Sequence, residues 1–103
     1  MQMTVTHEAA NWFQRELGVR SGDSIRLFIK YGGTSTLHPG FSLGLAVESP
    51  SEIGLSAKTD GIMVFMREDD IWYLNNQDLT IEWDPTEDEP RYVLSLTDAR
   101  NIN

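Results

Sequence analysis

The spacing of apolar residues changes once along this chain, from a helical period to an extended one. Residues 5–18 carry apolar side chains every three or four positions, which places them on one face of a helix. The residues on this face are Ala9, Ala10, Phe13 and Leu17. Thr6 can cap the helix, because its hydroxyl can accept a free N–H of the first turn, and Gly18 is a typical left-handed stop. We therefore predict one amphipathic N-terminal helix.

After a turn at residues 21–23, large apolar residues alternate with other residues, which is typical of strands. The predicted strands cover residues 25–31, 41–47, 62–66, 79–83 and 92–96. In the second of these, every residue between the large apolar ones is small, so we expect that side to lie close against another element. Between the third and fourth strands, one helical turn is expected, with Trp72 and Leu74 facing inward.

These elements predict an α+β protein, with an N-terminal helix and a mostly antiparallel or mixed β-sheet. A chain of 103 residues is long enough for one hydrophobic core, and 40% of its residues are hydrophobic, which is typical of a globular protein. The sequence contains no repeat and no linker. We therefore expect a single domain over residues 1–103.

Net charge and cysteine content exclude several classes of function. The formal net charge is −8, whereas nucleic acids and anionic membranes are bound through basic surfaces. No apolar run approaches the ~18–20 residues of a membrane span, and the N-terminus does not resemble a signal peptide. We therefore expect a cytoplasmic protein. The chain has no cysteine, which excludes a disulfide framework, a thiolate nucleophile and a zinc–thiolate cluster.

Residues 40–44, with the sequence GFSLG, match the G-x-S-x-G pattern of serine hydrolases. That motif requires a strand that turns sharply into a helix, but the residues after Ser42 continue a strand pattern. His7 and His38 both precede the serine, whereas the hydrolase order places the histidine last. We expect Ser42 to lie on the small side of a strand, with no catalytic role.

The loop that follows Tyr31 contains two glycines and His38. Glycines let backbone N–H groups converge on an anion, but no phosphate-loop signature fits and no helix pattern follows. A histidine can ligate a metal, but a site needs three or four convergent donors, and none stands at a diagnostic spacing. His38 is therefore a weak candidate ligand, and no metal site is predicted.

The most acidic segment of the chain lies between residues 82 and 89. It lacks the calcium-binding pattern of EF-hands, and Pro85 and Pro90 constrain it differently. Runs of charge are usually solvated faces or docking sites for basic partners. The candidate docking residues are Glu82, Asp84, Glu87, Asp88 and Glu89.

Six segments, taken in order, resemble the HesB-like family, the A-type carriers of iron–sulfur cluster assembly. They are TVTHEAANWFQREL, SIRLFIKYGG, GFSLGLAV, GIMVFM, WYLNNQDLTIEW and RYVLSL. The resemblance implies a HesB-like domain over the whole chain, in which the sheet folds into a small pseudo-barrel or sandwich.

The chain departs from that family at the residues that hold the cluster. Thr34 stands where the family has its first cysteine, and the chain ends in DARNIN where the paired cysteines would follow. Cluster iron is held by thiolates, and a threonine hydroxyl is far too weak an acid to replace one. We therefore expect neither an iron–sulfur cluster nor any other cofactor.

The leading interpretation is a non-catalytic HesB-like module, not an enzyme, that binds a protein or a small ligand through a loop. The expected binding residues are Tyr31, Gly32, Gly33, Thr34 and His38. One alternative is a thiolate-independent carrier of iron or another divalent metal that uses His38 with carboxylates. A second alternative is a small enzyme that uses the Gly-Gly loop as an anion site. The protein partner and the oligomeric state stay open.

Overall fold

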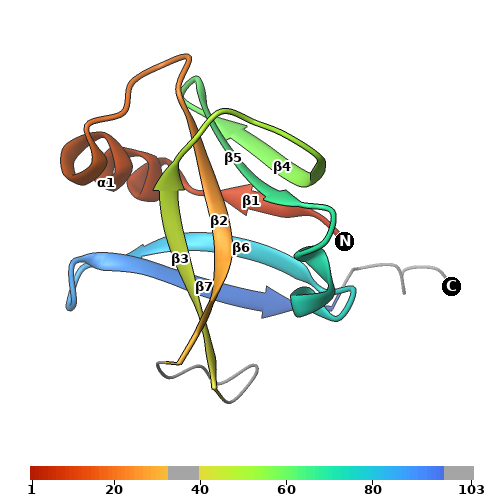
Figure 1. Cartoon of the computed structure of the whole chain (residues 1–103). Helices are drawn as coiled ribbons and strands as arrows, with labels where there is room; N and C mark the ends of the chain where they lie inside the picture. The colour runs from red at the N-terminus through yellow and green to blue at the C-terminus, as the bar shows by residue number, and fades with distance from the viewer. Residues whose placement is uncertain (33–39, 97–103) are drawn as a thin grey trace, which may run out of the picture.

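The computed structural model describes residues 1–32 and 40–96, which form one α-helix, seven strands and a short 3-10 helix (Figure 1). One sheet has the strand order β1 (Met3–Val5), β6 (Asp78–Asp84), β7 (Glu89–Ser95). The other has the order β3 (Phe41–Val47), β2 (Ser24–Tyr31), β5 (Ile62–Arg67), β4 (Ile53–Thr59). The helix α1 spans His7–Leu17, and the 3-10 helix η1 spans Ile71–Leu74.

The helix α1 begins and ends as its sequence predicts. The Thr6 hydroxyl accepts the N–H of Ala9 at 3.2 Å, and Gly18 has φ = 70°. The predicted apolar face is buried at Ala9, Ala10 and Phe13. In the described part of the chain, no helix has both the length and the apolar character needed to cross a bilayer.

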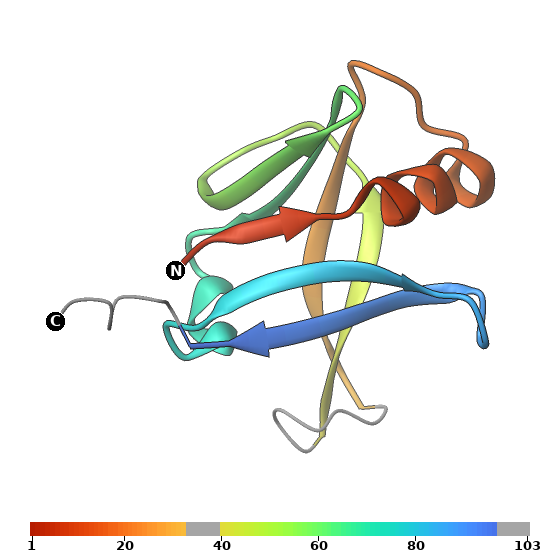
Figure 2. The ribbon, with the colours of Figure 1, turned by 180° about the vertical axis from the view of Figure 1, so that it is seen from behind.

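Both sheets are mixed, which confirms the predicted α+β class. In the first sheet β1 runs parallel to β6, and in the second β2 runs parallel to β5; the other neighbours are antiparallel. Strands β2 and β3 run across β6 and β7 in both views (Figures 1 and 2). The core draws side chains from both sheets and from α1, among them Phe13, Leu27, Val64, Leu79 and Ile81.

The small side of β3 lies against a large side chain, as predicted. A Cβ atom added to Gly44 would stand 2.7 Å from Cζ of Phe28, the residue paired with Gly44 on β2. The Phe28 ring therefore occupies the space that any side chain at position 44 would need.

Two strands were not predicted from the sequence. The strand β1 has only three residues, too few to establish a period. The strand β4 contains glycine, serine and lysine, and its register shifts between Ile53 and Leu55, which interrupts the alternation.

The predicted helical turn is present as η1, but the prediction for Trp72 is wrong. Tyr73 and Leu74 are buried, whereas Trp72 is 52% exposed. A 3-10 turn rotates about 120° per residue, so it cannot direct three successive side chains into the core.

The acidic loop between β6 and β7 is shorter than predicted, because β6 extends to Asp84 and β7 begins at Glu89. Pro90 lies on β7 and pairs with Trp83 of β6. Because β7 is an edge strand, the N–H that proline lacks is tolerated there.

Candidate interaction site

The predicted binding loop is described only at its start. Tyr31 is 88% exposed at the end of β2, and its ring centroid lies 5.3 Å from that of Phe41. The N–H of Gly32, at φ = 88°, donates to the carbonyl of Gly40 at 2.6 Å and closes the β2–β3 ribbon. Gly33, Thr34 and His38 lie outside the described residues.

Tyr31, Phe41 and Trp72 form an aromatic cluster on the surface. The Phe41 and Trp72 centroids are 6.0 Å apart at an interplanar angle of 82°, an edge-to-face contact. Buried Tyr73 supports the cluster, with its ring centroid 5.9 Å from that of Trp72. The sequence predicted Tyr31 as a binding residue but not Phe41 or Trp72. These two residues join the cluster because η1 lies beside the last residue of β2 and the first residue of β3.

An ion pair attaches η1 to β2 and so helps to place Trp72. The guanidinium of Arg26 on β2 donates to the carboxylate of Asp70, immediately before η1, at 3.0 Å. Both side chains are largely shielded from water, so salt screens this pair less than it would screen a fully exposed one. A second carboxylate, that of Glu48, lies 3.7 Å from Arg26. The Arg26–Asp70 pair therefore fixes the start of η1, which carries Trp72, against β2.

Three of the five acidic residues predicted as a docking surface have structural partners. Glu82 pairs with Arg91 at 3.2 Å, and Asp88 accepts a hydrogen bond from Arg15 at 2.6 Å. The Asp84 carboxylate accepts the N–H of Thr86 at 2.9 Å and stabilises the β6–β7 turn.

Glu87 and Glu89 carry no ion pair among the residues that the structure describes, and both are exposed. The acidic segment is thus mainly part of the hairpin, with two carboxylates directed at solvent. Its role in docking stays a prediction.

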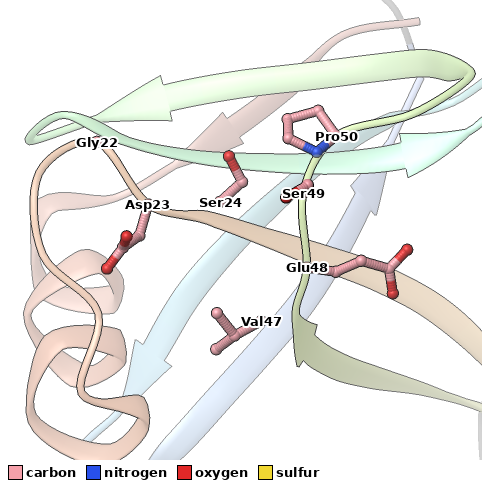
Figure 3. Close-up of a pocket in the computed structure, with 7 residues that line it drawn as sticks. All are labelled: Gly22, Asp23, Ser24, Val47, Glu48, Ser49 and Pro50. Carbon is pink, nitrogen blue, oxygen red and sulfur yellow. The ribbon is translucent and has the colours of Figure 1, made fainter.

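A surface hollow of about 290 Å³ opens where β3 ends (Figure 3). Its lining is Gly22, Asp23, Ser24, Val47, Glu48, Ser49 and Pro50. The carboxylates of Asp23 and Glu48 point to opposite sides in Figure 3, and Asp23 accepts the N–H of Arg20 at 2.9 Å. The two acidic groups do not converge, so we assign no ligand to this hollow.

The described ranges contain no group of three or more histidine, aspartate or glutamate side chains that could hold a metal ion. His7 contacts Asp60 at 2.5 Å, a single exposed pair that has too few donors for a metal site. His38 lies outside the described residues, so its role as a ligand stays untested.

Known proteins resemble this chain over nearly its full length. The Bacillus subtilis protein named pyruvate dehydrogenase inhibitor is 46% identical over 90 residues, covering 87% of this chain and 95% of that protein. An uncharacterized protein of Staphylococcus saprophyticus is 34% identical over 96 residues, covering 90% of this chain and 98% of that protein. An uncharacterized protein of Staphylococcus epidermidis is 34% identical over 95 residues, covering 89% and 97%. No protein-family model matches the chain.

These comparisons correct the HesB-like interpretation, which is wrong. No family model supports it, and the named relative is an inhibitor of pyruvate dehydrogenase. The resemblance rested on a capped helix, alternating strands and glycine positions, which many α+β proteins share because these features report local geometry. The residues that would have distinguished the carriers, their cysteines, are absent.

The functions derived from that interpretation are corrected with it. They were a HesB-like binding module, a thiolate-independent metal carrier and a small enzyme built on the Gly-Gly loop. The expectation that the chain is not an enzyme is confirmed at the level of its relatives, because the named one is an inhibitor. Identity of this extent, over almost the whole of both chains, shows common descent. The chain belongs to the family that contains the Bacillus subtilis pyruvate dehydrogenase inhibitor and these staphylococcal proteins.

Proposed function

We propose that this protein is a regulatory protein that binds a pyruvate dehydrogenase and lowers its activity. The observation that carries the proposal is the 46% identity to the Bacillus subtilis inhibitor over 95% of that protein's length. Inhibition requires that the protein and the enzyme meet, and a cytoplasmic location is part of the proposal for that reason.

The aromatic cluster is the surface that best suits such an interaction. Residues that dominate binding energy in protein interfaces are enriched in tryptophan and tyrosine. Tyr31 and Trp72 offer two exposed rings, and the Arg26–Asp70 pair holds the base of η1. Side chains that are already held in place before binding lose little conformational freedom on binding, which favours affinity.

The charge of the protein favours a partner surface that is basic around an apolar centre. The net charge is −8, and acidic residues 68–70 directly precede η1. Asp69 is exposed, with its side chain 3.9 Å from Arg67. Complementary charge at the rim of an interface mainly raises the association rate, so we expect the binding rate to fall as salt is added.

The proposal is tested with the purified protein and the pyruvate dehydrogenase of its source organism. We expect the enzyme's rate of pyruvate oxidation to fall as the protein is added, and calorimetry to detect a direct complex. A saturating excess that leaves the rate unchanged would contradict the proposal.

The binding surface is tested with Trp72→Ala, alone and combined with Tyr31→Ala. Loss of a central aromatic residue typically costs ~2 kcal/mol or more, so we expect about 30-fold weaker inhibition. Val93→Ala on β7 removes a partly exposed apolar side chain from another strand and is the matched control. Equal inhibition by the native protein, both aromatic variants and the Val93→Ala control would place the binding surface elsewhere while leaving the regulatory function intact.

A further inference from the structure

The strand β3 is an edge strand with an open row of backbone hydrogen-bonding groups. Among the strands that the structure describes, it pairs only with β2, at the outside of its sheet (Figures 1 and 2). Gly40 and Glu48, which flank β3, both bond to the β2 side: Gly40 accepts from Gly32, and Glu48 donates to the carbonyl of Ser24.

Antiparallel pairs alternate between bonded and non-bonded residues, so the even-numbered residues of β3 bond to β2. The odd-numbered residues point their N–H and C=O groups away from the sheet. These residues are Phe41, Leu43, Leu45 and Val47.

The other outer strands each carry a feature that discourages further pairing. Proteins protect sheet edges with short strands, bulges, prolines and charged residues. The strand β1 has three residues, β4 has a register shift and Lys58, and β7 has Pro90 and Arg91. The strand β3 has seven residues, FSLGLAV, with no charge and no proline, and its pairing with β2 runs without a register shift. Within the described residues it is the outer strand that lacks such protection.

We propose that β3 pairs with β3 of a second copy of this chain, antiparallel and in full register, so that two four-stranded sheets become one. Full overlap places Gly44 opposite Gly44 of the second copy, on the twofold axis. Phe41 then lies opposite Val47, and Leu43 opposite Leu45, each across the interface. These pairs all join odd-numbered residues, so they are bonded pairs in which each exchanges two hydrogen bonds.

A second copy fits this edge because the strand is complementary to itself. On one side of the paired strands the register aligns large apolar residues, and it covers Val47, which is 57% exposed. On the other side it aligns Ser42 with Ala46, both small, and Gly44 with Gly44, where the Phe28 ring of each copy occupies the space above the glycine.

Charge also permits this contact. Each copy carries a net charge of −8, so two copies repel each other over most of their surface. The strand β3 itself is uncharged, so two β3 strands can approach without like charges facing each other. On the small side the nearby charged residues are Glu48, which directly follows β3 and lies 3.7 Å from Arg26, and Lys30 and Arg26 on β2. In the paired form, Lys30 of one copy and Arg26 of the other are separated by three strand spacings, about 14 Å, which exceeds the screening length at physiological salt.

Two measurements test the pairing and its register. Light scattering during size-exclusion chromatography is expected to show a dimer of about 23 kDa, twice the 11.7 kDa of the chain. The lack of native cysteine allows a cross-linking test. Ser42 and Ala46 of opposite copies form a non-bonded pair with Cα atoms about 4.5 Å apart, a distance that a disulfide can span.

An equimolar mixture of Ser42→Cys and Ala46→Cys chains is therefore expected to form covalent dimers under mild oxidation. Either variant alone is expected to form about tenfold less, because equivalent positions are offset by four residues, about 13 Å. Strong cross-linking by a single variant would contradict the register.

A charge on the edge tests the interface without disturbing the core. Val47→Lys is expected to raise the dimer dissociation constant at least about tenfold, because lysine protects natural edges from pairing. Val93→Lys makes the same change on β7 and is expected to leave dimerisation unchanged. Circular dichroism of each variant confirms that it is folded.

A monomer at all concentrations, with inhibition of pyruvate dehydrogenase intact, would overturn the dimer but not the proposed function. A monomer whose Val47→Lys variant no longer binds the enzyme would instead assign the edge to the enzyme, and would also overturn the dimer. Dimerisation without inhibition would leave this inference standing and remove the proposed function.

Discussion

A carboxylate oxygen of Asp88 accepts a 2.6 Å hydrogen bond from the guanidinium of Arg15, which joins α1 to the β6–β7 hairpin across 73 positions of sequence. The same oxygen accepts the indole N–H of Trp83 at 2.9 Å, and the backbone carbonyl of Asp88 accepts the indole N–H of Trp12 at 2.8 Å. Asp88 is thus a junction between the helix and the first sheet.

Asp88→Ala is expected to destabilise the protein. The Arg15 pair is exposed and contributes little by itself, but the substitution also removes the Trp83 bond and places alanine at φ = 51°. Together these losses amount to ~1–2 kcal/mol in the free energy of unfolding, measured by urea titration.

Asp88→Asn is the control for that measurement, because asparagine tolerates positive φ and keeps an oxygen acceptor. We expect it to lose less than half as much stability as the alanine variant. If neither substitution changed the urea midpoint, the junction would have no role in stability.

Gly44→Val is expected to destabilise the sheet, because the new side chain would occupy the position of the Phe28 ring. Overpacking of this kind typically costs ~1–3 kcal/mol in the free energy of unfolding. Phe28→Ala vacates the space, so the double variant should recover part of the loss relative to the sum of the two single variants. Thermal unfolding of all four proteins measures the coupling, and strict additivity would show that the two residues do not compete for space.

Alkaline pH is expected to weaken the fold through Tyr92. Burial raises the pKa of the Tyr92 hydroxyl above its usual value of 10.0, and the nearby Glu89 carboxylate raises it further. A raised pKa means that the folded state favours the protonated form. This contribution to stability is therefore fully present below pH 10 and is lost as the pH rises above it.

Unfolding free energies at pH 8, 9, 10 and 11 test this dependence, and Tyr92→Phe should flatten the decline above pH 10. The control is Tyr31→Phe, because Tyr31 is exposed, and it should retain the decline of the native protein. Identical slopes for both variants would exclude Tyr92 as the cause.

The protein is expected to bind no iron–sulfur cluster, because the chain has no thiolate to hold the iron. Anaerobic incubation with iron and sulfide, followed by desalting, should leave neither metal nor acid-labile sulfide with the protein. A stable brown protein with stoichiometric iron and sulfide would refute this prediction.

The sequence alone could predict the local elements of this protein. The period of the apolar residues predicted α1 and five strands, and Thr6 and Gly18 marked the ends of the helix, because capping and amphipathicity depend on residues only a few positions apart. The same dependence on local features explains the error in family. A helix, alternating strands and glycines describe element geometry, and they do not distinguish one α+β family from another.

The candidate site could be predicted only in part. Tyr31 was expected at the binding surface, but its neighbours Phe41 and Trp72 are joined to it through packing between separate elements. The charge of Asp88 suggested docking, yet its partner Arg15 lies on the helix at the other end of the chain.

Composition and local pattern thus determined the net charge, the absence of thiol chemistry, the helix and most of the strands. Only the tertiary structure decided which strands are neighbours, which one is left as the open edge, and which aromatic rings meet on the surface. The physical reason is that side-chain period is a property of a segment, whereas pairing and packing depend on residues that are distant in sequence and become neighbours only when the core forms.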